Sequence, residues 1–417
     1  MHVDVCKRFL ILSVQYTFGN THDVSEDDIA NTWNVFAASA LSQAGGCKVV
    51  SIRPTSLNRF VIKSRDNLVI ILVPYKLLYG GDIDRLKGKL RLYSSQLFIN
   101  GGADYLDDVI EGLAKYKDDI ILYIHEYKNI RYYNIFKKYK NFIYILQQHS
   151  RGPFTYNISS LYKINILRKL KRAGFFVLSL HELLSLKSMK LGRLIKLRPM
   201  AVNLNELPYV TPENRCTVRR TLKMSCDKVV LSTYVGTPYV RYNKLYDVKG
   251  SHYLPIIINV MKKYLGNRVE FLVFGVSGFF KDHLESLGNV KVFPRLPRKD
   301  FLTYLSASDI YFLPAHSDLR FAGIGVAVME ALGIGVPVVS PTLIHIPDLD
   351  VVNDVGVVTP YLGSVEDAVR FASQLLYAVE NLSTFRPAVA REIVKKFYSW
   401  ESFVNDFKDT LENIMNY

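Results

Sequence analysis

The sequence contains no apolar run close to the ~18 residues that a helix needs to cross a bilayer. The first apolar segment, Phe9 to Val14, is too short for the core of a signal peptide, and no small-residue cleavage pattern follows it. We therefore expect a cytoplasmic protein without a transmembrane helix.

Cysteine is scarce, and no cysteine has the CxxC or Cys/His spacing of a metal site. The four cysteines are Cys6, Cys47, Cys216 and Cys226. This pattern predicts buried or free thiols in a reducing compartment, and it leaves open a Cys216–Cys226 pair in a thermophilic protein.

Acidic residues are absent from Lys128 to Arg172, a segment with eleven Lys or Arg in a chain of net charge +15. Aromatic residues such as Tyr132 and Phe136 alternate with the basic ones. Residues Leu161 to Arg172 predict an amphipathic basic helix, which is typical of proteins that dock on anionic membranes. Two other interpretations stay open. One is nucleic-acid binding, for which no RRM, KH or helix-turn-helix pattern is present, and the other is a solvated face over an aromatic core.

Hydrophobic residues make up 49% and charged residues 22% of the 417 residues, as in globular proteins, and this length predicts two domains. Apolar strands alternate with helices in both halves, which predicts parallel sheets and an α/β fold. The segment Lys196 to Pro212, with prolines at 199, 208 and 212, fits a hinge between the halves. We therefore place one domain over residues 1–199 and the next from residue 200.

The stretch FAGIGVAVMEALGIGVPVVS, from Phe321 to Ser340, combines a Gly-rich turn, a short apolar helix and a buried strand. The turn holds Gly323, Ile324 and Gly325, and the helix carries Glu330. Glycines ahead of a helix let backbone N–H groups approach an anion, and a helix N-terminus attracts phosphate. The stretch is therefore a candidate phosphate cradle, and the alternative is a helix–strand unit whose glycines serve packing alone.

Histidines follow three predicted strands of the first half. They are His125, His149 and His181, after the strands Asp119 to Ile124, Phe142 to Leu146 and Phe175 to Ser179. Parallel strands that end in polar residues indicate one ligand-facing edge of the sheet.

These motifs together resemble the GT-B glycosyltransferases, most closely the retaining glycosyltransferase family 4. The matching runs are LSTYVG (Leu231 to Gly236), Lys249-Gly250, FLVFG (Phe271 to Gly275), SASDIYFLP (Ser306 to Pro314), the Gly-rich stretch, and FYSWESFVNDF (Phe397 to Phe407). The first half matches through strand order and through QQH, which ends in His149.

The resemblance implies two Rossmann-like domains facing a central cleft. The acceptor-side domain would span residues 1–199 and receive the C-terminal helix 397–417, which crosses back to it, and residues 200–396 would bind the sugar nucleotide. It also implies sugar transfer with retention, without a cofactor or a required metal. The acceptor would be a glycan. The basic segment 128–172 predicts contact of the protein with an anionic membrane, which favours a lipid-linked acceptor at the cytoplasmic membrane face.

The resemblance also assigns roles to single residues. Lys249 would offset charge on the leaving diphosphate, Glu330 would accept hydrogen bonds from the ribose hydroxyls, and His149 would lie near the transferred sugar. Further donor contacts would come from Gly19, Gly236, Arg241 (or Lys244), Leu296, Gly323, Ile324 and Gly325.

One position departs from the family. Ala322 stands where the family usually has a glutamate that contacts the transferred sugar, and Asp318, four residues earlier, is the candidate substitute. Two functions therefore remain, a retaining glycosyltransferase and a non-catalytic GT-B protein that binds a nucleotide or glycan as the partner of an active transferase. No Ser-His-Asp order or paired-carboxylate spacing supports a hydrolase.

Overall fold

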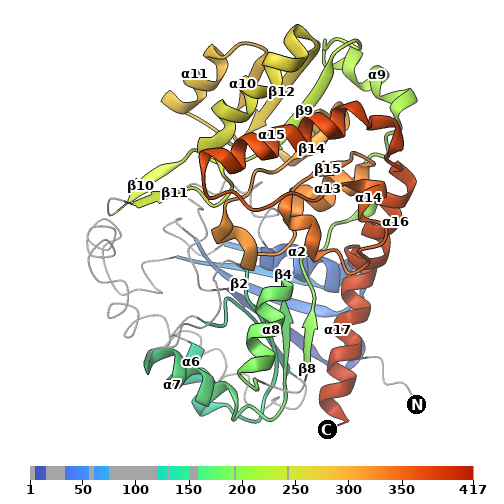
Figure 1. Cartoon of the computed structure of the whole chain (residues 1–417). Coiled ribbons are helices and arrows are strands. Elements are labelled where there is room, and N and C mark those ends of the chain that lie inside the picture. The colour runs from blue at the N-terminus through green and yellow to red at the C-terminus, as the bar shows by residue number, and fades with distance from the viewer. Residues whose placement is uncertain are drawn as a thin grey trace. The chain divides into compact units, whose positions relative to one another are not determined.

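The computed structural model describes residues 5–15, 33–55, 61–74, 120–128, 132–149, 158–191, 194–241 and 244–416 (Figure 1). The chain divides into two compact units, Met1–Ala201 with Trp400–Tyr417, and Val202–Ser399. This division falls two residues after the boundary expected from the proline-rich segment. The predicted donor contact Gly19 lies outside the described residues.

The first unit is built on an eight-stranded sheet with the order β3-β4-β2-β1-β5-β6-β7-β8. The strands are β1 (Leu10–Gln15), β2 (Lys48–Thr55), β3 (Val61–Arg65), β4 (Leu68–Pro74), β5 (Ile120–His125), β6 (Ile143–Gln147), β7 (Ala173–Val177) and β8 (Leu194–Leu197). β3 pairs antiparallel with β4, and the other pairs are parallel. Every residue of β5 and β6 is buried, as expected for strands that are covered on both faces. The edge strands β3 and β8 were not predicted.

The described helices of the first unit cover both faces of this sheet. They are α1 (Val5–Arg8), α2 (Trp33–Ser39), the π-helix η2 (Ala40–Ala44), α6 (Tyr132–Lys138), α7 (Ile158–Leu167), α8 (Leu180–Ser188) and α17 (Trp400–Met415). Aromatic residues of α6 and aliphatic residues of α7 and α8 pack on one face, and α17 packs with α2 and η2 on the other.

The predicted amphipathic helix Leu161 to Arg172 is wrong in its bounds, because α7 starts at Ile158 and ends at Leu167. Arg168 leaves the helix and its Nη2 donates a hydrogen bond to the carbonyl oxygen of Met189 at 2.6 Å. The remaining basic residues therefore form the turn into β7, which starts at Ala173.

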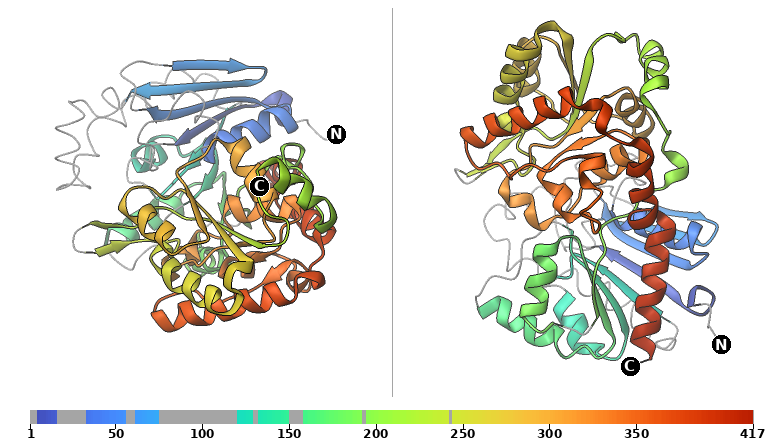
Figure 2. Two further views of the ribbon diagram at one scale, coloured as in Figure 1. Left: turned by 90° about the horizontal axis from the view of Figure 1, so that it is seen from above. Right: turned by 45° about the vertical axis from the view of Figure 1, so that its right-hand side comes forward.

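The closing helix α17 packs on the first unit, as predicted (Figure 1; Figure 2). Its Phe407 ring lies 5.4 Å from the ring of Tyr123 on β5 and 6.2 Å from that of Phe176 on β7. Its Asp406 accepts a hydrogen bond from the buried guanidinium of Arg198 at 3.0 Å. An aromatic face and one buried ion pair thus attach the helix to the sheet.

The second unit is built on a six-stranded, fully parallel sheet with the order β13-β12-β9-β14-β15-β16. The strands are β9 (Val229–Tyr234), β12 (Val269–Phe274), β13 (Val290–Phe293), β14 (Ile310–Phe312), β15 (Val338–Val339) and β16 (Gly356–Val357). This is the doubly wound order whose direction reverses between β9 and β14, the place where such sheets bind ligands. A separate antiparallel hairpin, β10 (Tyr239–Arg241) and β11 (Lys244–Tyr246), follows β9.

The helices of the second unit alternate with these strands. They are η4 (Leu204–Glu206), α9 (Pro212–Thr221), η5 (Ser251–Tyr253), α10 (Leu254–Leu265), η6 (Gly266–Arg268), α11 (Phe279–Ser286), α12 (Arg298–Ser306), η7 (Ser317–Phe321), α13 (Val326–Ile334), η8 (Pro341–His345), α14 (Val352–Val355), α15 (Val365–Glu380), η9 (Leu382–Thr384) and α16 (Pro387–Phe397). The alternation confirms the predicted α/β class for this half.

The interpretation of the cysteines as free thiols is wrong, since all four are paired. Cys6 bonds to Cys47, and Cys216 bonds to Cys226. The parallel pairing of β1 with β2 sets Leu10 opposite Lys48 and so brings α1 beside the start of β2, which the sequence spacing alone did not reveal. In the described part of the chain, no helix is both long and apolar enough for a membrane span.

Candidate functional site

Two loops meet at the point of the second sheet where the strand order reverses. One carries Val248, Lys249 and Gly250 after the hairpin, and the other carries Pro314 and His316 after β14. The N–H of His316 donates to the carbonyl oxygen of Val248 at 3.1 Å. Gly250 has φ +69°, and a Cβ on it would lie 1.8 Å from the carbonyl oxygen of Pro314. Only glycine fits there, so the Lys-Gly pair reflects a backbone requirement of the turn.

Asp247 holds this turn from the inside. Its carboxylate accepts hydrogen bonds from the Ser251 hydroxyl at 2.7 Å and from the His252 N–H at 2.6 Å. The residue therefore ties the loop to η5, the turn that precedes α10. Sequence reasoning missed Asp247, although an Asp four residues before a Ser that opens a helix is a usable signal.

Lys249 is half-buried beside β9. Its Nζ lies 4.4 Å from the centre of the Tyr234 ring, which is a cation–π distance. Burial lowers the pKa of Lys249 to about 8, against the opposing effect of Asp247. The ammonium group is therefore still mainly protonated at neutral pH and only partly hydrated, which suits a ligand with several negative charges.

The predicted phosphate cradle forms the entry to α13. Gly323 has φ +67°, Ile324 is buried, and Gly325 is the residue that precedes the helix. The first helical hydrogen bonds run from Val328 and Met329 back to the carbonyl of Gly325. The N–H groups of the first turn therefore point outward from the N-terminus of α13. A Cβ on Gly325 would meet no atom within 4 Å, which leaves the space that an anion site requires.

Glu330 lies in the middle of α13 and is 3% exposed. Its Oε1 accepts a hydrogen bond from Nη1 of Arg298, the first residue of α12, and Arg298 Nε lies 3.4 Å from the Glu206 carboxylate. Burial raises the pKa of Glu330, and Arg298 opposes this rise. Arg298 thus favours the ionised form of the Glu330 carboxylate. Sequence reasoning missed Arg298, because 32 residues separate it from Glu330.

The other predicted donor residues occupy the loops of the same unit. Gly236 follows β9, and Leu296 lies between β13 and α12. Arg241 ends β10, and its side chain is outside the described atoms. The Asp318 side chain is 67% exposed and lies 3.5 Å from His316 Nδ1, and Ala322 ends the turn η7.

His149 lies at the carboxyl edge of the first sheet, just after β6, and is buried. Its Nε2 lies 2.8 Å from Nδ1 of His125, the last residue of β5, and the two rings are stacked. His125 Nε2 lies 3.1 Å from the Ser13 hydroxyl on β1. Burial lowers the pKa of His149 to about 3, and burial together with His149 lowers the pKa of His125. Two predicted histidines therefore meet as a neutral pair, whereas His181 is exposed on α8.

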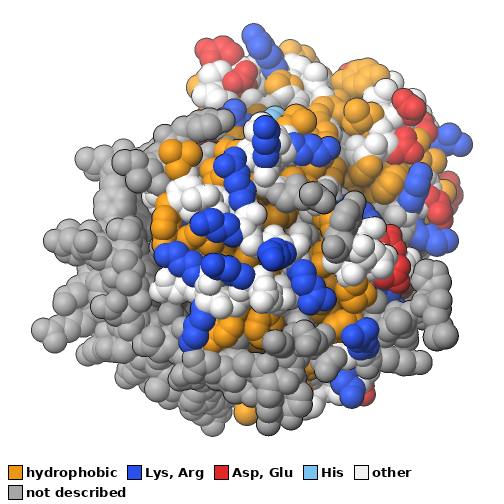
Figure 3. Space-filling model, turned by 90° about the horizontal axis from the view of Figure 1, so that it is seen from below, with side chains coloured by type: hydrophobic (Ala, Val, Ile, Leu, Met, Phe, Trp, Pro, Cys, Tyr) orange, Lys and Arg blue, Asp and Glu red, His pale blue; other side chains and the backbone are white. Residues whose placement is uncertain are grey.

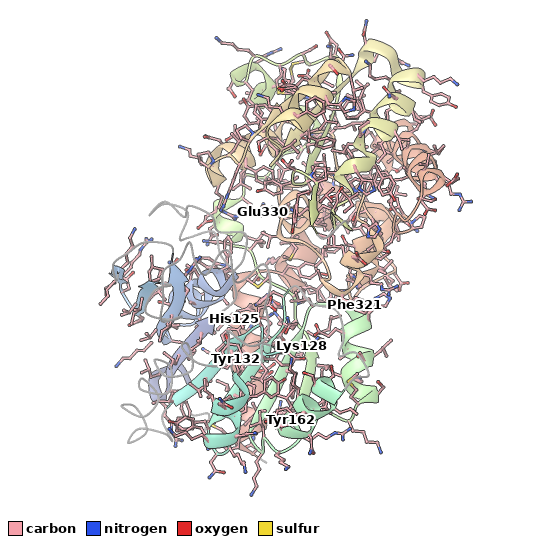
Figure 4. The ribbon with its side chains drawn as sticks, turned by 90° about the vertical axis from the view of Figure 1, so that its left-hand side faces the viewer. His125, Lys128, Tyr132, Tyr162, Phe321 and Glu330 are labelled. Atoms are coloured by element: carbon pink, nitrogen blue, oxygen red, sulfur yellow. A yellow bond between two sulfur atoms is a disulfide. The ribbon has the colours of Figure 1, made fainter. Side chains whose placement is uncertain are left out.

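Lys128 lies near this pair at the end of β5 (Figure 4). Its Nζ is 2.8 Å from Glu182, and both side chains are buried. This ion pair ties the loop after β5 to α8, so the first basic residue of the segment 128–172 is structural.

A basic and apolar surface covers α6, α7 and α8 (Figure 3). Its exposed basic residues are Lys137, Lys138, Lys140, Arg168, Lys169, Lys171, Lys187 and Lys190. Leu161, Tyr162 and Leu184 are exposed among them, and Lys137 Nζ lies 4.7 Å from the Tyr162 ring. From residue 132 to 191 the one acidic residue is Glu182, which is buried.

Comparisons with known proteins relate the chain to glycosyltransferases. Residues 240–381 match the family model "Glycosyl transferases group 1". A curated relative from Corynebacterium glutamicum, a GDP-mannose-dependent monoacylated alpha-(1-6)-phosphatidylinositol monomannoside mannosyltransferase, is 28% identical over 219 residues, which are 49% of this chain and 52% of the relative. The chain thus spans about half the length of that relative.

Two solved structures share the fold over nearly their whole length. Sucrose-phosphate synthase from Thermosynechococcus elongatus has a TM-score of 0.65 at 16% identity, covering 98% of this chain and 100% of that one. Anabaena HepE in complex with UDP-glucose has a TM-score of 0.59 at 13% identity, covering 97% and 99%. The fold is therefore that of the GT-B glycosyltransferases, and the chain resembles their group 1 family.

Proposed function

We propose that this chain is a retaining glycosyltransferase that moves a sugar from a nucleoside-diphosphate donor to a glycan acceptor. The single observation that supports it best is the donor site of the second unit. There the Lys249-Gly250 turn, the entry to α13 and the buried Glu330 belong to one sheet edge and to the segment that matches the family model.

The second unit would hold the donor. Lys249 would contact the diphosphate and stabilise the negative charge that develops as it leaves. The N–H groups after Gly323 would hold phosphate oxygens, and Glu330 would bind the ribose hydroxyls. Gly236, Arg241 and Leu296 would complete the pocket. No metal is required, because these groups supply the positive charge.

In the reaction, the bond between the anomeric carbon and the diphosphate breaks, and the acceptor oxygen bonds to that carbon on the same face. The acceptor proton leaves with the nucleoside diphosphate. His149 of the first unit would contact the transferred sugar as a neutral hydrogen-bonding group, since its low pKa excludes a charged ring at neutral pH. Asp318 would replace the missing carboxylate at Ala322.

We further propose that the acceptor is lipid-linked and that the chain works at the cytoplasmic membrane face. The surface of α6, α7 and α8 supports this, because exposed lysines surround exposed Leu161, Tyr162 and Leu184. Anionic headgroups would attract the lysines, and the apolar side chains would insert between them. Nucleic acid is the less suitable partner, since no known binding motif is present.

A second candidate function is donor or glycan binding without turnover, as the partner of an active transferase. Ala322 favours it, because the family's sugar-contacting carboxylate is missing at that position. The Lys249-Gly250 turn and Glu330 speak against it.

Thermal unfolding with UDP, GDP, UDP-glucose and GDP-mannose tests the donor site. One nucleotide at ~100 times its dissociation constant should stabilise the protein by about 2.7 kcal/mol. Lys249→Ala and Glu330→Ala should lose this stabilisation, while Lys263→Ala, an exposed lysine of α10, should keep it. Donor binding without release of nucleoside diphosphate to any acceptor would favour the second candidate. No stabilisation by any nucleotide would refute the transferase and leave only the glycan-binding form of the second candidate.

Vesicle flotation at ~0.15 M salt tests the membrane surface. The protein should float with vesicles of phosphatidylcholine and phosphatidylglycerol and not with phosphatidylcholine alone. Changing Lys137, Lys138 and Lys140 to Glu should abolish flotation. Changing Lys223, Lys263 and Lys299 of the second unit to Glu alters the net charge equally and should not. Equal loss of flotation in both variants would indicate an effect of net charge alone and would refute the proposed membrane-binding surface.

A further inference from the structure

Three side chains, from β1, from β5 and from the loop after β6, form a series of hydrogen bonds at the carboxyl edge of the first sheet. Ser13 Oγ lies 3.1 Å from His125 Nε2, and His125 Nδ1 lies 2.8 Å from His149 Nε2. The imidazole rings are stacked with 5.1 Å between centroids and 14° between planes. All three residues are buried. The series of hydrogen bonds thus ends at His149, the residue of the first unit to which the proposed function assigns a contact with the transferred sugar.

The surroundings keep both rings uncharged. Burial lowers the pKa of each histidine, and the neighbouring His149 lowers that of His125 further. Tyr123 stands 4.2 Å from the His125 ring and donates its own hydroxyl to Gln147.

Proton counting then limits the states of the pair. A neutral imidazole carries one N–H, so one nitrogen donates and the other accepts. If His125 donates through Nδ1, then His149 accepts at Nε2 and carries its proton on Nδ1. If His149 donates through Nε2, then His125 accepts at Nδ1 and carries its proton on Nε2, facing Ser13. In both cases the two rings have the same tautomer. The Ser13 hydroxyl donates to His125 Nε2 in the first case and accepts a hydrogen bond from it in the second.

We propose that His125 is the positioning residue that sets the tautomer of His149, with Ser13 at the other end of the series of hydrogen bonds. The proposal rests on the proposed function, in which His149 contacts the transferred sugar. The tautomer decides whether His149 Nδ1 is a hydrogen-bond donor or an acceptor. His125 therefore determines which kind of sugar hydroxyl contact His149 makes, without touching the substrate itself.

Nitrogen NMR of the ¹⁵N-histidine-labelled protein tests the tautomers directly, with no need for a substrate. His125→Phe and His149→Phe spectra assign the two rings, and the two signals that stay neutral on acidification identify them if a variant fails to fold. At about pH 7 both rings should be neutral with the same protonated nitrogen, Nδ1 in both or Nε2 in both. Opposite tautomers, or a charged ring, would overturn the proposal.

Turnover of the donor tests whether His125 acts through His149. The measured quantity is nucleoside diphosphate released from UDP-glucose or GDP-mannose, whichever stabilises the wild-type protein. His125→Phe should lower kcat about tenfold to 100-fold, with the donor KM within about twofold, because the donor is held by the second unit. In a His149→Phe background the same change should have no further effect. Additive losses would overturn the proposal, and His283→Phe on exposed α11 is the control.

The two tests also separate failures. A wild-type protein that binds no nucleotide and releases no diphosphate would refute the proposed function, while the NMR result would still decide whether the tautomers are coupled. Normal turnover in His125→Phe would refute the positioning role and leave the proposed function intact.

Discussion

The carboxyl edges of the two sheets are built from different chemistry. In the second unit the edge consists of backbone turns with positive φ at Gly250 and Gly323, the cation of Lys249, and the carboxylate of Glu330 beside Arg298. In the first unit the edge carries the neutral pair of His125 and His149, and the charges of the nearby Lys128 and Glu182 are buried and paired with each other. The second edge therefore suits a ligand with charge, and the first suits hydroxyl groups.

This difference teaches that the two halves divide the work of the proposed reaction. A leaving diphosphate needs cations and backbone N–H groups, and the second unit has both. A sugar or acceptor hydroxyl needs hydrogen-bonding groups of fixed donor or acceptor character, and a neutral imidazole provides one of each. The neutral pair of His125 and His149 meets that need.

The disulfides provide the first test of this comparison. Each unit contains one disulfide, and the two bonds close loops of different length. Cys6 and Cys47 are 41 residues apart, and Cys216 and Cys226 are 10 apart. Longer loops lose more entropy in the unfolded chain, so replacing the first pair by Ala should cost about 4 kcal/mol and replacing the second about 3 kcal/mol. Urea unfolding followed by tryptophan fluorescence measures the first unit, since Trp33 and Trp400 both lie there, and circular dichroism follows both units.

Reduction of the wild-type protein with a thiol is the control for this prediction, because it breaks both bonds without changing a side chain. The reduced protein should lose stability in both units. If the Cys216 and Cys226 variant lost more stability than the Cys6 and Cys47 variant, the loop-length argument would be wrong for this fold.

Gly250 provides a comparison of two turns. A Cβ at Gly250 would collide with the carbonyl of Pro314, whereas a Cβ at Gly46 of the first unit would meet no atom within 4 Å, and φ is positive at both. Gly250→Ala should therefore lower the free energy of unfolding by at least about 3 kcal/mol, and Gly46→Ala by only about 1 to 2 kcal/mol. Urea unfolding followed by circular dichroism measures both, and equal losses would contradict the collision.

The second unit was the more predictable from sequence, for a physical reason. A backbone anion site needs glycine at set positions, so Gly250, Gly323 and Gly325 leave a local pattern that can be read without a fold. The strands β9, β12, β13, β14 and β15 coincide with predicted apolar runs, whereas β16 and the hairpin of β10 and β11 were not predicted. The Arg298–Glu330 contact left no pattern, because it depends on how α12 packs beside α13.

The first unit could be predicted only in outline. Its apolar strands were located, but Ser13 and His125 are 112 residues apart and meet only because β1 and β5 are neighbours in the sheet. Nothing in the local sequence distinguishes a histidine that caps a strand from one that belongs to such a series of hydrogen bonds. The disulfide Cys6–Cys47 was not predicted for the same reason, since it also depends on the order of the strands in the sheet.

Acid should affect the first unit before the second. The pKa values of His125 and His149 lie below the unfolded value of 6.5, so the unfolded chain binds more protons below about pH 6.5, down to about pH 3 in the case of His149. Stability is therefore full above that window and falls by about 1.4 kcal/mol per pH unit for each histidine as pH drops through it. The pKa of Glu182 is raised, so this carboxyl group has the opposite effect on stability as the pH falls, but it is a single group against two histidines. Urea unfolding followed by tryptophan fluorescence measures the slope.

His125→Phe is the matched variant for this slope, because it removes one of the two histidines. The dependence of unfolding free energy on pH should then become shallower by about 1.4 kcal/mol per pH unit, whatever the absolute stability of the variant. An unchanged slope would mean that His125 is protonated in the folded protein and would contradict the neutral pair.

Alkaline pH should act on the second unit alone, through nucleotide binding. The pKa of Lys249 is about 8, so the ammonium group is charged at about pH 7 and largely uncharged at about pH 9. If the charge holds the diphosphate, the dissociation constant of the preferred nucleoside diphosphate should rise about tenfold between these pH values, as titration calorimetry would measure. Lys249→Arg should bind with little change over the same range, because a guanidinium stays charged. A dissociation constant that rose equally in Lys249→Arg would assign the titration to another group, and one that stayed flat in the wild-type protein would remove Lys249 from the diphosphate site.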